Sequence, residues 1–255
     1  MPEGESLEHE PLFLFILTPP FSGSTALAQM LNSGPDSMFL EERAEGQWLV
    51  PGLHDGDRWN PDMPVDWSSV RAVWQARIGL VEKLVGPMKL VIEKSPPHLV
   101  RADQLVREFP QHRLVALNRN PHANLSSMLY RHHPAETMRE PERIEMLKKL
   151  SRAWITRSTW LKQWIEQYRI MSLTYETFCE DPENALKKIA ELLPFDAGFD
   201  PDRPVRVKDY PAQGIVNQNP RQVERLSKDE RAVISEQLAE HEALVESFGY
   251  SVEWD

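Results

Sequence analysis

The segment 12–31, LFLFILTPPFSGSTALAQML, joins an apolar run to a helical pattern through a short loop of small and hydroxyl-bearing residues. Such a loop directs backbone N–H groups and the positive end of a helix dipole at one point, and this favours a bound phosphate. SGST alone is equally typical of an ordinary turn in which Ser24 or Thr25 caps a helix. The pattern G-x-x-x-x-G-K-[ST] of nucleotide-binding loops is absent, since Gly23 has neither the earlier glycine nor a following lysine.

A second candidate phosphate contact lies in RLVALNRNPHANLSSMLYR, residues 113–131. Arg119 ends an apolar run, and Ser127 follows eight positions later. Pro121 suits the first turn of a helix, so the pattern predicts Arg119 at a strand tip and Ser127 two turns into that helix. Both side chains could then contact one phosphate group. The alternative is that Arg119 pairs with an acidic neighbour and that Ser127 faces solvent.

Elements that would position these residues alternate along the chain. Short apolar, β-leaning segments at 12–17, 89–94, 113–119 and 169–175 each precede a helical pattern. The helical patterns cover 98–109, 123–131 and 141–168, and a last one runs from Ser227 as N-cap to Gly249 as stop signal. This alternation predicts an α/β fold, a three-layer sandwich with a central, mainly parallel sheet. Ligands of such sheets bind beyond the carboxyl ends of the strands, where both candidate loops would lie.

Composition bounds the possible functions. The 255 residues, 41% of them hydrophobic, suffice for one large core, and we expect a loose acidic tail at 1–10 and a single domain at 11–255. A net charge of −10 argues against a nucleic-acid partner. Cys179 is the single cysteine, so no internal disulfide can form. The apolar run at 12–17 is too short to span a membrane, and we expect a cytoplasmic protein.

An irregular insert at about 44–70 interrupts the alternation. It is rich in Gly, Pro and Asp and carries Trp48, Trp59 and Trp67, with Trp74 close behind. Long irregular segments inside compact domains usually serve function, so we expect these tryptophans to line an apolar acceptor cleft or a lid. Trp160 and Trp164 lie four apart in a helical pattern, which indicates core packing.

Together these motifs resemble the sulfotransferases that use 3′-phosphoadenosine 5′-phosphosulfate (PAPS) and release 3′,5′-ADP. The likeness covers about residues 12–250, in the order PPFSGSTALAQML, IEKSPPHL, RNPHANLSSMLYR and LTYETFCEDPENAL, and the ending NQNPRQVERLS…FGY is also similar. It implies a P-loop-like sulfotransferase architecture without a metal. In this family the first loop holds the 5′-phosphosulfate, the Arg/Ser pair holds the 3′-phosphate, and a tyrosine contacts adenine. The corresponding residues are Phe21, Ser22, Gly23, Ser24 and Thr25, then Arg119 and Ser127, and finally Tyr175.

Phe21 departs from the family pattern, which has Lys or Arg at this position to stabilise charge on the departing phosphate. The resemblance places Lys94, in IEKSPP, beside the phosphosulfate, and we favour Lys94 as the substitute cation. Two alternatives remain: a slow or binding-only site, and Phe21 as a wall of the acceptor pocket. The loop N–H groups do not depend on the side chain, so cofactor binding is less affected than turnover.

A general base must also stand close to the acceptor hydroxyl. Relatives that act on membrane-bound or peptide acceptors carry a catalytic glutamate in a similar P-D…E-E spacing, and this implies Glu42 here, with Glu41 next and Glu45 nearby. The alternative is a solvated acidic run. The soluble small-molecule branch uses a histidine where this chain has Pro96. His132 and His133 are adjacent and diverge on a helix, so no metal site is expected.

The sequence therefore predicts an enzyme that transfers a sulfuryl group from PAPS to a hydroxyl of a small-molecule, lipid or carbohydrate acceptor. Two rival functions remain open. One is a catalytically silent protein that binds PAPS or 3′,5′-ADP, for which Phe21 is the main argument. The other is a nucleotide-dependent phosphotransferase with a degenerate P-loop, disfavoured by the missing Gly-Lys pair. Neither the acceptor nor the oligomeric state can be deduced from the sequence.

Overall fold

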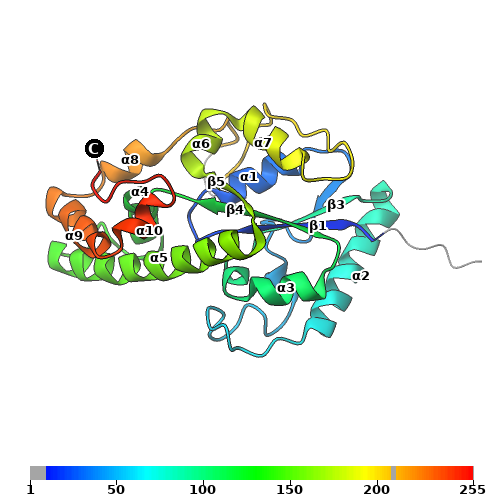
Figure 1. The fold of residues 1–255 in the computed structure, drawn as a ribbon, viewed down its shortest axis with the longest axis horizontal. Helices are drawn as coiled ribbons and strands as arrows, with labels where there is room; N and C mark the ends of the chain where they lie inside the picture. Colours follow the sequence, from blue (N-terminus) through cyan, green and yellow to red (C-terminus); the bar gives the residue numbers. More distant parts are fainter. Residues whose placement is uncertain (1–9, 208–210, 255) are drawn as a thin grey trace, which may run out of the picture.

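The computed structural model describes residues 10–207 and 211–254. Its centre is a five-stranded sheet in the order β2-β3-β1-β4-β5, and every strand pair is parallel (Figure 1). The strands are β1 (Leu12–Leu17), β2 (Ser37–Phe39), β3 (Leu90–Glu93), β4 (His112–Asn118) and β5 (Met171–Thr174). The predicted α/β class is confirmed, and the sheet is parallel throughout.

Both faces of the sheet are buried, which explains the continuous apolar runs in the sequence. Alternate residues of β1 point to opposite faces: Phe13, Phe15 and Leu17 belong to one apolar cluster, and Leu12, Leu14 and Ile16 to another. All six are at most 8% exposed. A strand with two buried faces needs apolar residues at every position, and no alternation with polar residues can appear.

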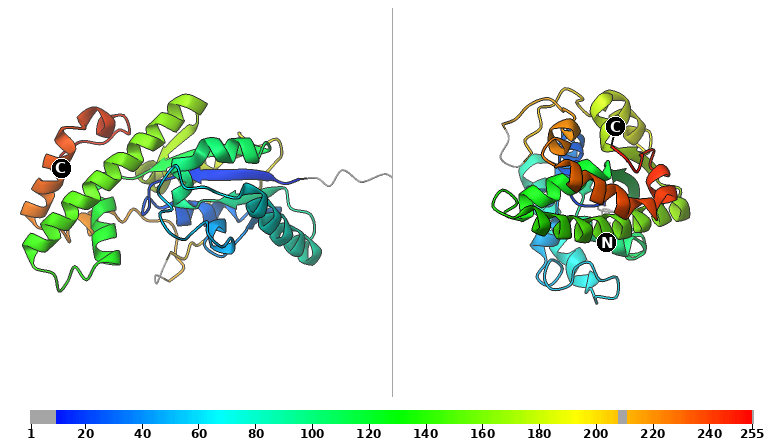
Figure 2. Two further views of the ribbon diagram at one scale, coloured as in Figure 1. Left: turned by 90° about the horizontal axis from the view of Figure 1, so that it is seen from below. Right: turned by 90° about the vertical axis from the view of Figure 1, so that its left-hand side faces the viewer.

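Helices cover the two faces as separate layers (Figures 1 and 2). One layer holds α1 (Ser24–Leu31), α6 (Tyr175–Glu180) and α7 (Pro182–Ala190). The opposite layer holds α2 (Trp67–Val85), α3 (Ala102–Glu108) and part of α5 (Glu140–Tyr168). Beyond the sheet, α5 packs with α4 (Pro121–His132), α9 (Lys228–Ala239) and α10 (Glu242–Glu246) in a third cluster. The remaining short helices are η1 (Gly46–Leu49), η2 (Pro96–Arg101) and α8 (Asn219–Val223).

Three features differ from the sequence-based expectations. Strand β2 was not predicted, because three residues give no period to detect. The final helix is two helices, since α9 ends at Ala239 and α10 begins at Glu242; the predicted cap Ser227 does form a capping box with Glu230. The segment 98–109 divides into the end of η2 and helix α3.

The insert is less irregular than expected, and two of its tryptophans were misassigned. Trp67 opens α2 under the N-cap Asp66, and Trp74 is fully buried against Phe13 and Phe109. Both belong to the core and not to a cleft, because α2 covers one face of the sheet. Trp48 is 41% exposed and Trp59 is half-buried, so these two remain candidates for an acceptor surface.

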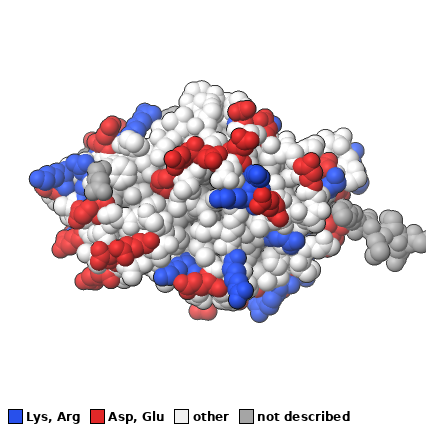
Figure 3. Space-filling view, turned by 45° about the horizontal axis from the view of Figure 1, so that its top comes forward, with Lys and Arg blue, Asp and Glu red and all other residues white. Residues whose placement is uncertain are grey.

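Charged side chains of both signs are interspersed on the face drawn in Figure 3. Exposed cations such as Lys89 and Arg139 each lie beside a carboxylate, that of Asp36 and that of Glu142. Within the described residues, no helix is long and apolar enough to cross a membrane.

Candidate active site

The loop after β1 lies at the carboxyl edge of the sheet and leads into α1, as the sequence predicts. Gly23 is the residue before the helix and has φ +87°, a conformation that glycine adopts without steric cost. Phe21 has φ +66°, which is uncommon for a residue with a side chain. Ser24 and Thr25 open the helix, so their backbone N–H groups point out of its first turn.

Tyr175, the first residue of α6, closes one side of this loop. A Cβ atom at Gly23 would stand 2.3 Å from Cδ2 of the Tyr175 ring, so the backbone and the ring are in direct contact. The Tyr175 hydroxyl donates to the carbonyl oxygen of Val216 at 3.0 Å and accepts from the Gln218 N–H at 3.1 Å. These bonds fix the ring, and burial raises the pKa of Tyr175 to about 12 despite the nearby Arg119 charge.

Arg119 lies between the loop and Tyr175, as a phosphate ligand would. Its guanidinium carbon is 4.3 Å from the centroid of the Tyr175 ring, and Nη1 donates to the Phe21 carbonyl oxygen at 3.0 Å. Nε donates to Asn219 Oδ1 at 2.8 Å, whereas Nη2 is buried without a partner. Burial lowers the pKa of Arg119, and no carboxylate among the described residues pairs with it.

Glu176 joins the elements around Arg119. One carboxylate oxygen accepts from the Asn120 N–H and from Asn219 Nδ2, and the other accepts from the Tyr250 hydroxyl. Asn219 therefore belongs to the site, and the only sequence signal for it was the family-like stretch NQNP. Asn124 of α4 supports the loop by donating to the Pro20 carbonyl oxygen at 2.8 Å.

Ser127 is half-buried on α4, two turns after Asn120, which caps that helix. The neighbouring Ser126 is fully buried and donates to the Gln222 carbonyl oxygen at 2.6 Å. Ser127 itself makes no hydrogen bond to any described residue, so its hydroxyl is available to a ligand. Its role as a phosphate contact stays a prediction.

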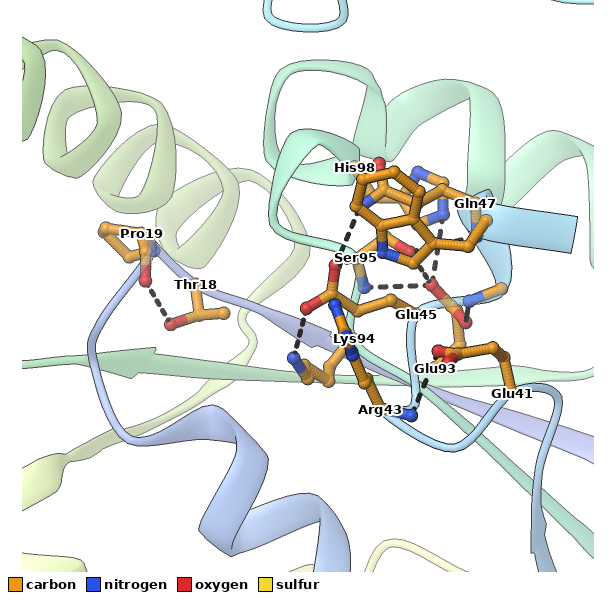
Figure 4. Close-up of polar contacts among 12 residues, drawn as sticks. Thr18, Pro19, Glu41, Arg43, Glu45, Gln47, Glu93, Lys94, Ser95 and His98 are labelled. Carbon is orange, nitrogen blue, oxygen red and sulfur yellow. Dashed lines mark hydrogen bonds and ion pairs between the residues drawn. The ribbon is translucent and has the colours of Figure 1, made fainter. Parts of the chain in front are cut away.

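Lys94 follows β3 at the same edge of the sheet and pairs with Glu45 (Figure 4). Nζ lies 2.6 Å from Glu45 Oε1, and the side chains are only 4% and 17% exposed. The other carboxylate oxygen of Glu45 accepts from Gln47 Nε2 and from the Trp48 indole N–H. Burial opposes ionisation of Glu45, yet the Lys94 charge and these hydrogen bonds outweigh it and hold the pKa below its ordinary 4.5.

The backbone around Glu45 is fastened to the residues that flank Lys94. The Lys94 N–H donates to the Ala44 carbonyl oxygen at 2.8 Å, and the Gly46 N–H donates to Glu93 Oε2 at 2.6 Å. Glu93 is 1% exposed and also accepts from the Ser95 N–H and hydroxyl. The Glu45–Lys94 pair is therefore positioned by a buried network, unlike a surface ion pair.

The predicted bases Glu41 and Glu42 lie near this pair along the chain, in a different setting. Glu41 accepts from the Arg43 N–H at 3.0 Å and is half-buried, whereas Glu42 is exposed. Neither contacts Lys94. Glu45 is the carboxylate that the fold brings to the lysine, because the turn through Ala44, with φ +57°, reverses the chain there.

Phe21 occupies the position at which the resemblance implies a cation. Its ring and the His132 ring are in edge-to-face contact, with their centroids 5.0 Å apart. This contact suits a wall of a pocket. The described residues contain no group of three or more His, Cys, Asp or Glu side chains that could hold a metal. Two hollows, one beside Phe13 and one beside Met171, lie at the amino ends of the strands, away from this site.

The comparisons with known proteins agree with this geometry. Residues 11–197 match the model of the sulfotransferase family. No match is found among curated proteins. A sulfotransferase from Alicyclobacillus acidocaldarius has a similar structure, with a TM-score of 0.60 at 18% identity, over 95% of this chain and 97% of that one.

Two mycobacterial structures are also similar. Sulfotransferase STF9 from Mycobacterium avium gives a TM-score of 0.56 at 14% identity, over 98% of this chain and 79% of that one. Sulfotransferase STF1 from Mycobacterium tuberculosis H37Rv gives a TM-score of 0.50 at 15% identity, over 94% of this chain and 76% of that one. At such identities the structures establish the shared fold, and the family match over 11–197 establishes membership. The chain belongs to the sulfotransferase family.

Proposed function

We propose that this protein transfers a sulfuryl group from PAPS to the hydroxyl of a small-molecule, lipid or carbohydrate acceptor. The observation that carries the proposal is Arg119, a buried guanidinium that forms no ion pair with a described carboxylate and has an orphaned Nη2; Glu176 is near enough to favour its charge without contacting it. A buried charge without a partner is costly, and a bound phosphate would compensate it. Tyr175 and the loop 21–25 stand on either side of this cation.

The donor fits the residues around Arg119. The first-turn N–H groups of α1 and the hydroxyls of Ser24 and Thr25 would hold the 5′-phosphosulfate. Arg119 and Ser127 would hold the 3′-phosphate, with Tyr175 against the adenine. Ser22 is buried, and its Oγ accepts from Asn124 Nδ2 at 3.3 Å, so it shapes the loop more than it meets ligand. Bound PAPS supplies an activated sulfuryl group and a phosphate leaving group.

Lys94 supplies the positive charge that Phe21 cannot. Its ammonium would stabilise the charge that develops on the departing phosphate. In the structure Glu45 neutralises the Lys94 charge. When Lys94 turns toward the donor, Glu45 loses its strongest electrostatic partner and becomes a better proton acceptor.

This exchange favours Glu45 as the general base, although the spacing pointed to Glu42 and then to Glu41. The base must reach a proton on the acceptor hydroxyl, which attacks in line with the departing phosphate. Glu45 already contacts Lys94, whereas Glu42 faces solvent. Glu42 and Glu41 remain the alternatives, and substitution distinguishes the three carboxylates.

A thermal shift experiment tests the choice of nucleotide. A ligand at 100 times its Kd should stabilise the fold by roughly 2.7 kcal/mol. We expect 3′,5′-ADP to raise the unfolding midpoint without a metal, and ATP to have a smaller effect. A preference for ATP with Mg²⁺ would instead favour a phosphotransferase. Binding of 3′,5′-ADP without turnover of PAPS over a broad panel of acceptors would favour a silent binding protein.

A further inference from the structure

Three arginines at or against the insert form no ion pair with an acidic side chain within the described residues. They are Arg58 in the insert, Arg101 at the end of η2, and Arg157 on α5. The chain has 39 acidic residues against 29 Lys and Arg, and several exposed cations lie beside a carboxylate. An excess of acid elsewhere makes an acid-free group of three arginines unusual.

Arg101 and Arg157 both contact the short backbone segment 58–60, which begins with Arg58 itself. Arg101 is fully buried, and its Nη2 donates to the carbonyl oxygens of Arg58 and Asn60 at 2.9 and 3.3 Å. The guanidinium of Arg157 lies 4.1 Å from the centroid of the Trp59 ring. Nε and Nη1 of Arg101 and Nη1 of Arg157 are buried donors without a hydrogen-bond partner. A buried donor left without a partner destabilises the fold.

The charges of Arg58 and Arg157 also repel each other. Burial, together with the neighbouring charge of Arg58, lowers the pKa of Arg157 to about 10. Two acidic residues of the insert are engaged elsewhere: Asp55 lies beside His54 and accepts from the Gly52 N–H, and Asp66 caps α2. The other two nearby, Asp57 and Asp62, form no ion pair with an arginine within the described residues. An arrangement that combines orphaned donors with mutual repulsion is stabilised by an added anion.

A short path connects this group to the reacting atoms. The guanidinium of Arg58 lies 5.5 Å from the centroid of the Trp48 ring, and the Trp48 indole N–H donates to Glu45 at 3.0 Å. Glu45 in turn contacts Lys94. One tryptophan side chain, that of Trp48, therefore separates Arg58 from the proposed base.

We propose that Arg58 and Arg157 recognise an oxyanion on the acceptor, so that the enzyme sulfates hydroxyl compounds that already carry a carboxylate, phosphate or sulfate group. This inference rests on the proposed function and names its substrate class. Trp48 and Trp59 would cover the apolar part of that acceptor. Arg101 is a positioning residue, because its two hydrogen bonds hold the segment 58–60, which must shift outward to admit an anion to the orphaned donors.

The test uses the full chain saturated with 3′,5′-ADP, so that the nucleotide site is occupied. Sodium sulfate, phosphate and acetate are titrated at constant ionic strength, with chloride as the balancing anion, and the unfolding midpoint is followed. We expect at least one oxyanion to raise the unfolding midpoint in a saturable way. A stronger effect of acetate would indicate that the acceptor carries a carboxylate, and a stronger effect of phosphate or sulfate would indicate one of those groups. Arg58→Gln and Arg157→Gln should each weaken this binding about tenfold or more, as expected for a lost charge-assisted contact.

Arg152→Gln is the matched control, since Arg152 is exposed on the same helix α5. Arg152→Gln should leave the oxyanion affinity unchanged. The conservative variant Arg157→Lys keeps the charge and should retain most of the parent affinity. The exposed setting of the segment around Arg58 makes Arg58→Gln the variant that keeps the fold if Arg157→Gln does not. No saturable binding, or equal affinities in Arg58→Gln, Arg157→Gln and the parent protein, would overturn the proposal.

The same measurements separate this inference from the proposed function. Arg119→Ala removes the proposed 3′-phosphate contact and leaves the three arginines intact. In nucleotide-free Arg119→Ala protein, oxyanion binding that is sensitive to Arg58→Gln supports the acceptor site even if 3′,5′-ADP fails to bind. Oxyanion binding that disappears with Arg119→Ala and persists in Arg58→Gln would mean that the ions occupy the nucleotide site, and the proposal would be wrong.

Discussion

The Nζ atom of Lys94 lies 2.6 Å from Oε1 of Glu45, in a pair that is almost entirely buried. The fold therefore holds a cation and a carboxylate together at the carboxyl edge of the sheet, and the proposed sulfuryl transfer uses one of each. Breaking a buried pair by removing one partner is costly, because the other charge remains without compensation. Opening the pair would be less costly if each charge gained compensation, Lys94 from the phosphosulfate and Glu45 from the proton that it would accept. This makes the pair a stable resting state that a bound donor can open.

Lys94→Met should abolish sulfuryl transfer while 3′,5′-ADP still binds within a few-fold of the parent affinity. The substitution keeps the length of the side chain and removes the charge that would stabilise the departing phosphate. Calorimetry with 3′,5′-ADP and a coupled PAPS assay measure the two quantities. Lys89→Met is the control, because Lys89 forms an exposed pair with Asp36.

Phe21→Lys examines the same argument from the loop. In the Lys94→Met background it should restore part of the activity if the site lacks only a cation. A Lys94→Met enzyme that transfers at the parent rate would show that the charge comes from another residue.

Glu45→Gln should lower the transfer rate by ~10²–10⁴, the usual contribution of a general base, with little change in affinity for 3′,5′-ADP. Glu42→Gln and Glu41→Gln are measured beside it, and we expect smaller losses from both. A large loss in Glu42→Gln with a normal rate in Glu45→Gln would assign the base to Glu42, as the spacing in the sequence suggests. Unchanged rates in all three variants would place the base outside this segment.

The stability of the protein should depend on the Glu45 charge at acidic pH. The folded pKa of Glu45 is lower than its ordinary value of 4.5, so its stabilisation is present above that value and is lost as the pH falls through the folded pKa. Glu45→Gln should therefore be less stable than the parent at pH 7, by about 1–3 kcal/mol, and the gap should narrow below pH 4.5.

Urea unfolding from pH 7 to pH 3 measures that gap. Asp36→Asn is the comparison, since its partner Lys89 is exposed and an exposed pair contributes little. A gap between Glu45→Gln and the parent that stays constant over this range would mean that the Glu45 charge does not stabilise the fold.

Arg119→Ala should weaken the binding of 3′,5′-ADP far more than the binding of 5′-AMP, because only 3′,5′-ADP carries the 3′-phosphate that Arg119 would hold. Calorimetry with both nucleotides gives the comparison. Arg113→Ala serves as control, since Arg113 lies on β4, the strand that leads to Arg119, and donates to the Leu192 carbonyl oxygen outside the site. Equal losses for the two nucleotides would indicate that Arg119 acts through the Phe21 carbonyl and Tyr175, as a structural residue.

The sequence alone determined the α/β architecture, because strands buried on both faces must be apolar at every position and helices must follow them. It also located the loop at Gly23 and the strand tip at Arg119, since each is marked within a few residues of local sequence. Local sequence did not predict three other features: strand β2, the burial of Trp74 in the core, and the residues that contact Arg119.

Tertiary structure decided which carboxylate meets Lys94. Glu41, Glu42 and Glu45 are alike in type and lie within five positions, so composition and spacing cannot separate them. Glu45 is selected because Gly46 is fixed to Glu93 and the Lys94 N–H is bonded to Ala44, contacts between segments nearly fifty residues apart. The gathering of Arg58, Arg101 and Arg157 arises in the same way, since η2 and α5 both reach the segment 58–60 only when the sheet and helix α5 are packed.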